Sequence, residues 1–348
     1  MSLRLPDPGY KRYLSLIVFI GLLNVSVGYM YTEGKSAAEI TPLKIDGAPA
    51  GIVFIADPHL RVSTINQTRE IIRRINELHP SVVLIGGDFT YGEGDDEEEL
   101  ALQNVWSGID APVYAVLGNH DYKSGIDASG WLQKTLQVRK ASLKSEHYDV
   151  SCLRDRSADE KYADRISGIL ASNGVTVLRN EYQEIMIDGR SVIIVGVDDC
   201  WAGMAKPPEV PEHGSFVVYM IHEPECRADW DADLILAGHT HGGQYIPPGS
   251  ERIISGGLVT FSGKIENGPT TTYITRGIGT SNLDITLRSS PPEIVVINPS
   301  PYGQPENVPL SVLAKVSSGL REITVFLIIF CSVEIPNTIV PKFQEPII

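Results

Sequence analysis

Carboxylate, imidazole and amide side chains follow apolar runs at several places in this sequence, and their chemical types are those that bind metal ions. Five apolar runs end in such residues: Asp57-Pro58-His59, Gly87-Asp88, Gly118-Asn119-His120-Asp121, His222-Glu223 and Gly238-His239-Thr240-His241. Oxygen and imidazole ligands without thiolates suit divalent Mn, Fe or Zn, and imidazole argues against a pure Mg or Ca site. More than four such ligands predict more than one metal ion, and an Asp between two ions can hold them about 3.5–4 Å apart for phosphoryl displacement.

The spacing of these residues indicates that they lie together. Asp57 and Asp88 are 31 residues apart (88 − 57), and so are Asp88 and Asn119 (119 − 88). About 30 residues is the length of one strand–helix–strand unit. Because ligands bind at the carboxyl ends of the strands in open α/β sheets, neighbouring strands are expected to deliver these side chains to one site.

The elements that must position these residues alternate between strand and helix patterns in the first half of the chain. Residues 51–56 (GIVFIA) form a continuous apolar run, typical of a strand buried on both faces. Thr64 and Gln67 have the spacing of a capping box, and the helix that they begin is expected to end at His79-Pro80. The runs SVVLIGGD and PVYAVLGNHD supply two more strands, which predicts a parallel sheet with right-handed crossovers.

The second half of the chain is richer in strand patterns. Asp188-Gly189 separates two β-rich runs, which is a strong hairpin signal. Further strands are expected from FVVYMIHE, DLILAGHTHGG, TTTYITRGIG and EIVVINP. We therefore predict an α/β fold: a two-sheet β-sandwich flanked by helices, with an N-terminal hydrophobic helix. The charged segment 134–167 is either a lid over the site or decoration on the surface.

The N-terminal region contains an uncharged stretch, Tyr13 to Met30, which is about the minimum length for a helix that crosses a ~30 Å hydrocarbon core. We favour a membrane anchor over a cleaved signal peptide, which Lys11 and Arg12 would also suit. The basic residues place the N-terminus in the cytoplasm. Residues 1–12 would then be cytoplasmic, residues 13–30 a single-pass anchor or signal segment, and the catalytic domain extracytoplasmic at the cell membrane.

Beyond these segments, residues 48–300 are expected to form the catalytic domain and residues 301–348 a C-terminal extension. The extension contains a second apolar run, Ile323 to Val333, which is too short to cross a membrane. We favour a buried strand over an interfacial patch for this run.

The composition limits the partners of the chain. Its formal net charge of −14 over 348 residues argues against a nucleic acid partner, because phosphate binding relies on a basic surface. Four cysteines are too few for a disulfide framework in a chain of this length, and we interpret them as buried thiols: Cys152, Cys200, Cys226 and Cys331.

Five other residues that often mark sites match none of these motifs. His79, His147 and His213 lie in polar stretches and are interpreted as structural. Trp131 and Trp201 are expected to be packing residues rather than platforms for a substrate.

The ordered blocks D-x-H, GD, GNHD, H and GHTH, from about Gly51 to Gln244, resemble the signature of calcineurin-like metallophosphoesterases. The resemblance implies two divalent metal ions with seven ligands: Asp57, His59 and His241 on the first ion, Asn119, His222 and His239 on the second, and Asp88 bridging. It also implies that His120 contacts the substrate phosphate and assists the leaving group, that Asp121 orients His120, and that a metal-bridging hydroxide attacks phosphorus.

The later blocks GHTHGGQ, TRGIGTS and PPEIVVI resemble a membrane-associated branch that includes phosphodiesterases and a UDP-2,3-diacylglucosamine hydrolase of lipid A synthesis. The expected function is hydrolysis of a lipid-linked or cell-envelope phosphodiester at the membrane. Two alternatives are a UDP-2,3-diacylglucosamine pyrophosphate hydrolase and, from another class, a catalytically inactive binding scaffold. The scaffold is less favoured because none of the ligand positions is missing.

Overall fold

The computed structural model describes most of the chain between residues 8 and 299. The described residues are 8–34, 37–94, 96–103, 105–211, 214–244, 260–281, 288 and 290–299. The predicted C-terminal extension, its apolar run and His213 lie outside them. The chain divides into two compact units, and both sheets belong to the unit Val27–Glu306.

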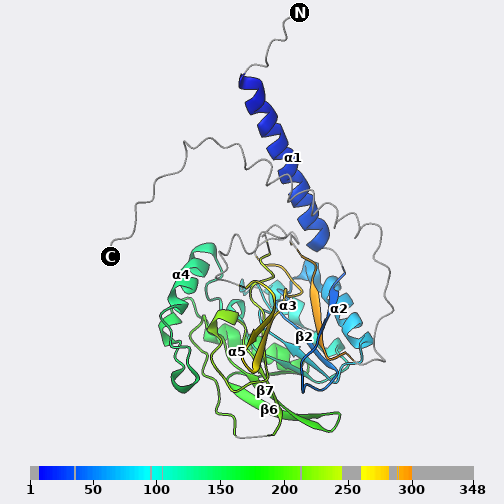
Figure 1. Ribbon diagram of the computed structural model, residues 1–348, viewed down its shortest axis with the longest axis vertical. Coiled ribbons are helices and arrows are strands. Elements are labelled where there is room, and N and C mark those ends of the chain that lie inside the picture. Colours follow the sequence, from blue (N-terminus) through cyan, green and yellow to red (C-terminus); the bar gives the residue numbers. More distant parts are fainter. Residues whose placement is uncertain are drawn as a thin grey trace, which may run out of the picture. The chain divides into compact units, whose positions relative to one another are not determined.

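Two mixed sheets of six strands each, with helices beside them, confirm the predicted two-sheet α/β fold (Figure 1). The first sheet has the order β1 (Glu39–Leu43), β12 (Glu293–Ile297), β2 (Ile52–Ile55), β3 (Val82–Ile85), β4 (Val113–Ala115) and β5 (Val175–Val177). The second has the order β10 (Gly263–Asn267), β11 (Thr270–Ile274), β9 (Leu234–Ala237), β8 (Phe216–Met220), β7 (Arg190–Gly196) and β6 (Glu181–Ile187).

The central strands of both sheets are parallel, as the alternation of strand and helix patterns predicts. In the first sheet β2, β3, β4 and β5 pair in parallel, and in the second sheet β7, β8, β9 and β11 do so. Antiparallel pairs join β12 to β2 and β10 to β11. The parallel neighbours therefore bring their carboxyl ends to a common edge of each sheet.

The predicted hairpin joins β6 and β7. Asp188 and Gly189 form its turn with φ values of 48° and 76°. Two consecutive residues with positive φ are typical of the type I′ turn that matches the twist of a hairpin. This prediction is confirmed.

The central strands, such as β2, β3, β8 and β9, are buried on both faces because side chains pack on both sides of them. Phe54 of β2 lies in a core cluster between the sheets, together with Val218 of β8. The next residue, Ile55, points to the opposite face and belongs to a cluster with Ile75 of α2 (Ile65–Glu77). Alternate residues of one strand therefore serve two different cores.

Three helices cover the outer face of the first sheet. They are α2, α3 (Asp96–Leu102) and α5 (Glu160–Ser172), and all three contribute to the same core cluster. The helix α2 begins directly after Thr64, as predicted, but the predicted capping box is wrong. The hydroxyl of Thr64 bonds to the backbone of Arg61 instead, because a turn of 3-10 helix precedes α2.

The segment 134–167 packs on both sheets: its last residues belong to α5 on the first sheet, and residues 138–153 pack on the outer face of the second. It begins within α4 (Ala128–Val138), and the side chains of Val138, Val150 and Leu153 are buried in a cluster with residues of β7 and β8. These residues are therefore part of the core, and whether the segment also acts as a lid over the site stays a prediction. Short 3-10 helices complete the described elements: η1 (Val62–Thr64), η2 (Trp106–Gly108), η3 (Asn119–Tyr122), η4 (Ser145–His147), η5 (Ser151–Leu153) and η6 (Pro224–Cys226).

The N-terminal segment forms the helix α1 (Pro8–Gly34). Asn24 and Ser26 place polar groups within its apolar run, and Asn24 Nδ2 donates to the carbonyl of Ile20 at 2.8 Å. Among the residues that the structure describes, no helix combines the length and the apolar character that crossing a membrane requires. The predicted membrane-spanning helix is therefore not supported.

The packing between the sheets leads to a test of the core. Phe54 is fully buried between them, and we expect Phe54→Ala to lower the free energy of unfolding by about 3–5 kcal/mol, because it removes apolar contacts and leaves a cavity. Urea unfolding of the full chain measures this change. Tyr182→Ala, at a half-exposed position of β6, is the control and should cost much less. Equal losses in both variants would contradict the assignment of the core.

Candidate metal centre

The five predicted clusters lie together, because each follows the carboxyl end of a parallel strand. Asp57 follows β2, Asp88 follows β3 and Asn119 follows β4 in the first sheet. His222 follows β8 and His239 follows β9 in the second sheet. Both sheets therefore contribute side chains to one site, as the position of the clusters after strand ends predicts.

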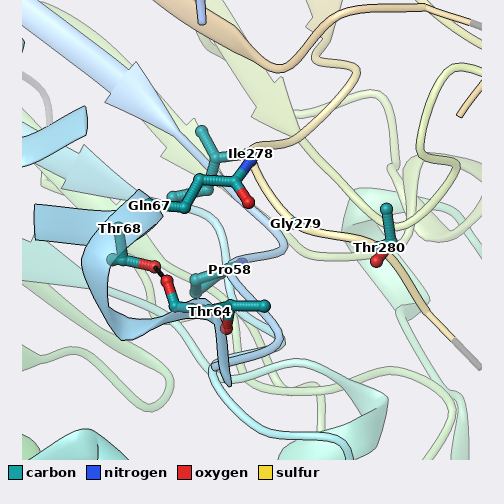
Figure 2. Close-up of a pocket in the computed structure, with 7 residues that line it drawn as sticks. All are labelled: Pro58, Thr64, Gln67, Thr68, Ile278, Gly279 and Thr280. Atoms are coloured by element: carbon teal, nitrogen blue, oxygen red, sulfur yellow. Dashed lines mark hydrogen bonds between the residues drawn. The ribbon is translucent and has the colours of Figure 1, made fainter. Parts of the chain in front are cut away.

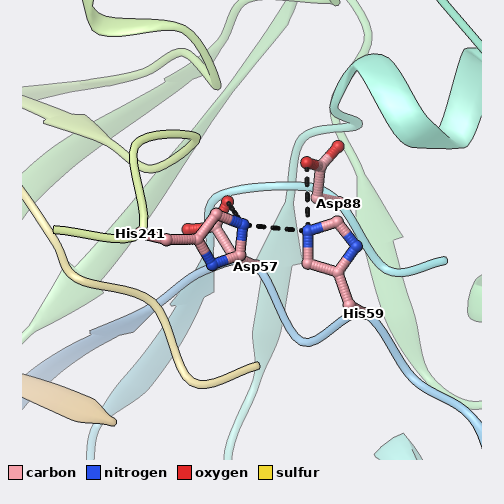
Figure 3. A group of neighbouring side chains, drawn as sticks. All are labelled: Asp57, His59, Asp88 and His241. Atoms are coloured by element: carbon pink, nitrogen blue, oxygen red, sulfur yellow. Dashed lines mark hydrogen bonds and ion pairs between the residues drawn. The ribbon is translucent and has the colours of Figure 1, made fainter. Parts of the chain in front are cut away.

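The first group of possible metal ligands consists of Asp57, His59, Asp88 and His241, whose ligand atoms all lie within 4.8 Å of one another (Figure 3). Nε2 of His59 is 3.0 Å from Nε2 of His241 and 3.4 Å from Oδ2 of Asp88. Nε2 of His241 is 3.8 Å from Oδ1 of Asp57. All four side chains are buried.

The second group consists of Asp88, His222 and His239, with Asn119 beside them. Nε2 of His222 is 3.0 Å from Oδ2 of Asp88 and 3.3 Å from Nδ1 of His239. Nδ1 of His239 is 3.1 Å from Oδ1 of Asn119. The amide nitrogen of Asn119 donates to the carbonyl of Ser124 at 2.7 Å, so its oxygen is the atom turned toward the histidines. Asp88 is common to the two groups.

Backbone carbonyls determine which nitrogen of three histidines can bind a metal. The three contacts are His59 Nδ1 to Thr90 (2.9 Å), His222 Nδ1 to Gly86 (2.7 Å) and His241 Nδ1 to Gly279 (3.3 Å). A carbonyl oxygen only accepts hydrogen bonds, so each Nδ1 carries the hydrogen and each Nε2 is left as the ligand atom. Carbonyl partners of this kind are typical of metal-binding histidines.

The contacts between the ligand atoms of the first group fit a site for a divalent metal ion. The Nε2 atoms of His59 and His241 face each other at 3.0 Å, although the carbonyl contacts leave a lone pair on each. Oδ2 of Asp57 is buried and has no hydrogen-bond partner among the described residues. A cation held by the Asp57 carboxylate and the two Nε2 atoms would give these groups a partner, and the mixture of carboxylate and imidazole suits Mn, Fe or Zn.

The pKa shifts show which ligands are available near neutral pH. Burial lowers the pKa of His59 and His239 well below the ordinary value, and that of His241 to about 3. These rings are therefore neutral and can donate lone pairs. Burial also lowers the pKa of His222, but the neighbouring Asp88 carboxylate outweighs burial and raises it well above the ordinary value. The Asp88 carboxylate therefore favours the protonated form of the His222 ring, which lies 3.0 Å from it.

His120 lies beside the two groups without joining either. Its ring stands edge-on to that of His59, with the centroids 4.6 Å apart. Its Nδ1 contacts the carbonyl of Tyr91 at 2.7 Å, and its backbone N–H donates to Oδ1 of Asp88 at 2.9 Å. His120 is thereby held next to the shared carboxylate.

The carboxylate of Asp121 binds backbone N–H groups of the loops around the site. It is buried and accepts from the backbone N–H groups of Gly118 (3.0 Å), Phe89 (3.2 Å) and Thr90 (3.1 Å). The ring nitrogen of His120 is instead held by the carbonyl of Tyr91. The geometry therefore gives Asp121 the task of joining the turns after β3 and β4, rather than direct orientation of the ring.

The backbone of the ligand residues is unusual. Asp57, His59, Asp88, His239 and His241 all have φ between 39° and 70°, in the left-handed region that non-glycine residues seldom occupy. Such conformations cost of order 1–3 kcal/mol each and cluster at functional sites. Sharp turns at the strand ends aim these side chains into the site.

Several contributors to the site have no motif that marks them. The carbonyls of Gly86, Thr90 and Gly279 are backbone atoms, which any residue type supplies. Gly277 is different, because a Cβ atom there would lie 2.7 Å from Oδ2 of Asp57, and its φ of 67° favours glycine. In the sequence, the run TRGIG marks this position, because glycines directly after a strand indicate that another part of the chain approaches the backbone closely.

A small pocket beside the first group is not the candidate site (Figure 2). Its lining contains neither a carboxylate nor an imidazole: Pro58, Thr64, Gln67, Thr68, Ile278, Gly279 and Thr280. The side chains that can bind a metal ion are therefore those of the two ligand groups and not those of this pocket.

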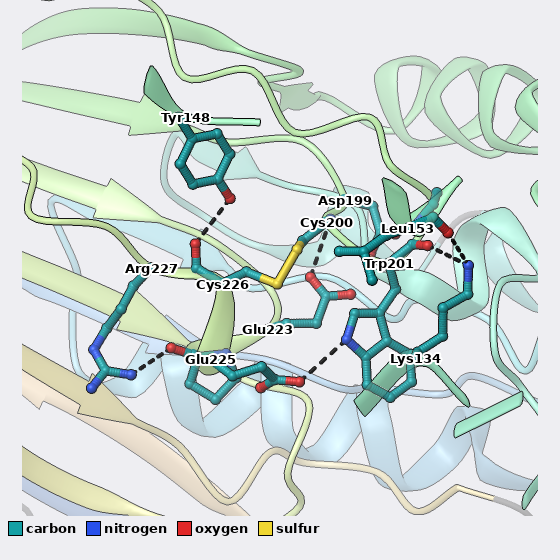
Figure 4. Close-up of a disulfide and its surroundings, with 12 residues drawn as sticks. Lys134, Tyr148, Leu153, Asp199, Cys200, Trp201, Glu223, Glu225, Cys226 and Arg227 are labelled. Atoms are coloured by element: carbon teal, nitrogen blue, oxygen red, sulfur yellow. Dashed lines mark hydrogen bonds between the residues drawn. A yellow bond between two sulfur atoms is a disulfide. The ribbon is translucent and has the colours of Figure 1, made fainter. Parts of the chain in front are cut away.

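The interpretation of all cysteines as thiols is wrong, because Cys200 and Cys226 form a disulfide (Figure 4). The strands β7 and β8 are parallel neighbours, so the loops that follow them meet at one edge and bring together two cysteines 26 residues apart. Cys152 is free and exposed, and Cys331 lies outside the described residues. The disulfide lies beside the loop that carries His222.

Comparison with known proteins adds a family match and several relatives. A sequence model of the family described as Calcineurin-like phosphoesterase matches residues 51–243. The chain is 28% identical over 251 residues to Phosphodiesterase YaeI of Escherichia coli (strain K12), which covers 68% of this chain and 77% of that protein.

Two further relatives are similar at comparable identity. The chain is 26% identical over 299 residues to the Uncharacterized metallophosphoesterase YkuE of Bacillus subtilis (strain 168), covering 79% of this chain and 91% of that protein. It is also 26% identical over 219 residues to the UDP-2,3-diacylglucosamine pyrophosphatase LpxG of Chlamydia trachomatis, covering 57% and 65%. All three alignments have low identity and extend over more than half of this chain.

The shifted pKa of Asp57 leads to a test of metal binding. Burial raises this pKa to about 7, so the metal-free carboxyl group gains a proton as the pH falls through that value. A metal ion must displace that proton, and we expect the affinity for Mn²⁺ to fall by roughly tenfold or more between about pH 8 and pH 6. Calorimetric titration measures the affinity, and buffers of different ionisation enthalpy count the released protons. An affinity that is constant over this range would contradict the prediction.

Proposed function

Because the family model matches more than half of its length, this chain belongs to the calcineurin-like phosphoesterase family, and on that premise we propose that it hydrolyses a phosphodiester with two divalent metal ions. Its family membership and its relatives make it a hydrolase of phosphoesters. This result favours an enzyme over the alternative of an inactive binding scaffold.

The observation that carries the two-metal proposal is the position of Asp88. The same oxygen, Oδ2, lies 3.4 Å from Nε2 of His59 in the first group and 3.0 Å from Nε2 of His222 in the second. A carboxylate between two sets of imidazoles is suited to bridge two cations, which two-metal hydrolases hold about 3.5–4 Å apart.

The proposed ligands are those that the sequence motifs indicate. They are Asp57, His59 and His241 for the first ion, Asn119, His222 and His239 for the second, and Asp88 for both. Two ions held there would supply Lewis acidity, which polarises a phosphoryl oxygen and makes a water molecule a better nucleophile near neutral pH. Mn, Fe and Zn all suit this donor set.

His120 is the proposed general acid. Its Nδ1 donates to the carbonyl of Tyr91, so Nε2 is the nitrogen that remains for the substrate. The acid is the imidazolium form of His120, which carries a hydrogen on both nitrogens. When water adds to phosphorus and releases a proton, the bond to the leaving oxygen breaks, that oxygen takes the proton from Nε2, and the proton from water restores the imidazolium. The bond from the backbone of His120 to Asp88 keeps this acid at a fixed place relative to the shared carboxylate.

We propose a lipid-linked or cell-envelope phosphodiester as the substrate class. A relative named as a phosphodiesterase supports the bond type, and a relative named as a UDP-2,3-diacylglucosamine pyrophosphatase supports the lipid link. The Cys200–Cys226 disulfide supports a catalytic domain outside the cytoplasm, because disulfides persist in oxidising compartments. Hydrolysis of a nucleotide-linked pyrophosphate is the second candidate, on the same relative's evidence.

The number of metal ions tests the proposed site. We expect elemental analysis of the full chain to find about two divalent ions per chain. Asp88→Asn should lower this number and the activity on an aryl phosphodiester, because the bridging charge is lost. Asp110→Asn, on a surface loop, is the matched control and should change neither. A wild-type content of one ion, with Asp88→Asn fully active, would refute the proposal.

The leaving group tests the role of His120. General acid catalysis contributes typically 10²–10⁴-fold, so His120→Asn should lower kcat by about that factor on an alkyl phosphodiester while both ions stay bound. The loss should be smaller on an aryl phosphodiester, because an aryl oxide leaves with little protonation.

His147→Asn is the matched control for this variant, because His147 is exposed in η4. It should behave like the wild type on both substrates. If His120→Asn loses activity equally on both substrates with both ions bound, His120 only positions the phosphate. If this variant loses metal, His120 is itself a ligand.

A further inference from the structure

His239 lacks the backbone support that the other three imidazole ligands have. Nδ1 of His59, His222 and His241 contacts a backbone carbonyl. Nδ1 of His239 faces the second ligand group instead, toward Asn119 and His222. Its other nitrogen, Nε2, makes no hydrogen bond within the described part of the chain. Metal-binding histidines almost always have a partner on the second nitrogen, so the orientation of His239 must come from elsewhere.

Trp201 packs against the ring of His239. Its indole ring is fully buried and lies edge-on to the ring of His239, with the centroids 4.4 Å apart and the planes at 71°. Edge-to-face aromatic contacts of this kind are worth about 0.5–1.5 kcal/mol beyond their buried area. The indole therefore restricts the rotation of an imidazole that no carbonyl holds.

Trp201 is itself held from several sides (Figure 4). Its Nε1 donates to Oε1 of Glu225 at 3.2 Å, and its carbonyl accepts from Lys134 Nζ at 2.7 Å and from Ser124 Oγ at 3.0 Å. The preceding residue, Cys200, is bonded to Cys226. The disulfide and two of the hydrogen bonds hold the backbone of Trp201, and the bond to Glu225 holds the indole ring itself.

The contacts of Trp201 and Cys200 also connect to the other ligands of the second group. Ser124, which donates to the carbonyl of Trp201, uses its own carbonyl to accept from the side chain of Asn119 at 2.7 Å. Cys226 ends η6, which follows His222 in the chain. The supports of the first group, the carbonyls of Thr90 and Gly279, belong to other loops.

We propose that Trp201 is a positioning residue for the second metal ion, which orients His239 and is braced by the Cys200–Cys226 disulfide. The inference rests on the proposed two-metal function. It predicts that replacing Trp201 weakens the binding of the second ion more than that of the first, because only the ligands of the second ion depend on Trp201.

Titration of the metal-free full chain with Mn²⁺ tests this inference. The wild type should bind two ions, and Trp201→Leu should weaken the second by roughly 10–100-fold, the usual effect of removing the support of a ligand. The affinity for the first ion should stay within about twofold of the wild type. Trp201→Phe keeps an aromatic edge and should recover part of the loss. Excess Mn²⁺ should restore most of the kcat of Trp201→Leu on an aryl phosphodiester.

Two matched controls separate positioning from general damage. Trp230→Leu removes another buried tryptophan of the same core cluster, one whose ring contacts among the described residues are with Tyr148 and Tyr219, and both ions should bind normally. The double variant Cys200→Ser with Cys226→Ser should weaken the second ion only, whereas Cys152→Ser, at the free exposed cysteine, should have no effect.

The outcomes distinguish this inference from the proposed function. A wild type that binds one ion refutes the two-metal function. A wild type with two ions, and a Trp201→Leu variant with unchanged affinities, refutes only the positioning role. Equal weakening of both ions in Trp201→Leu also refutes it, as does equal weakening in Trp230→Leu. Retention of the first ion shows that a variant has folded.

Discussion

The buried carboxylate of Asp88 is the group on which the rest of the site depends. A carboxylate removed from water is costly unless positive charge and hydrogen bonds surround it. Here Oδ2 contacts imidazoles from both sheets, and Oδ1 accepts from the backbone of His120. The residues after β2, β3, β4 and β8 must therefore meet at one point. The parallel arrangement of the central strands makes this possible, because it places their carboxyl ends along common edges.

The orientation of the ligands comes mostly from the backbone. Carbonyls of Gly86, Thr90 and Gly279 hold the rings of His222, His59 and His241. These carbonyls belong to turns at strand ends, so the fold that brings the ligands together also selects the nitrogen that binds. The second ligand group relies more on side chains, and a disulfide reinforces it. The two halves of the site therefore differ in how they are supported, although they share one carboxylate.

Two expectations from the sequence failed because each depended on a contact that local pattern does not contain, and a third was not supported for a different reason. The hydroxyl of Thr64 bonds to Arg61 and not to its own helix, because a preceding 3-10 turn offers a nearer partner. Cys200 and Cys226 have no telling spacing, and only the pairing of β7 with β8 brings them together. The apolar run of α1 had suggested a membrane-spanning helix, which the described residues do not support.

Local patterns along the chain predict the strands, the helices and the residues that follow the strand ends. Apolar runs and the residues that follow them are local features, so the candidates Asp57, Asp88 and His222 could be named without a structure. The packing of the two sheets is needed to show that Asp88 lies in both ligand groups, which nitrogen of each imidazole is free, and that Trp201 contacts His239. The physical reason is distance along the chain. His59 and His241 are 182 residues apart, and two atoms so separated meet only after both sheets have packed against each other.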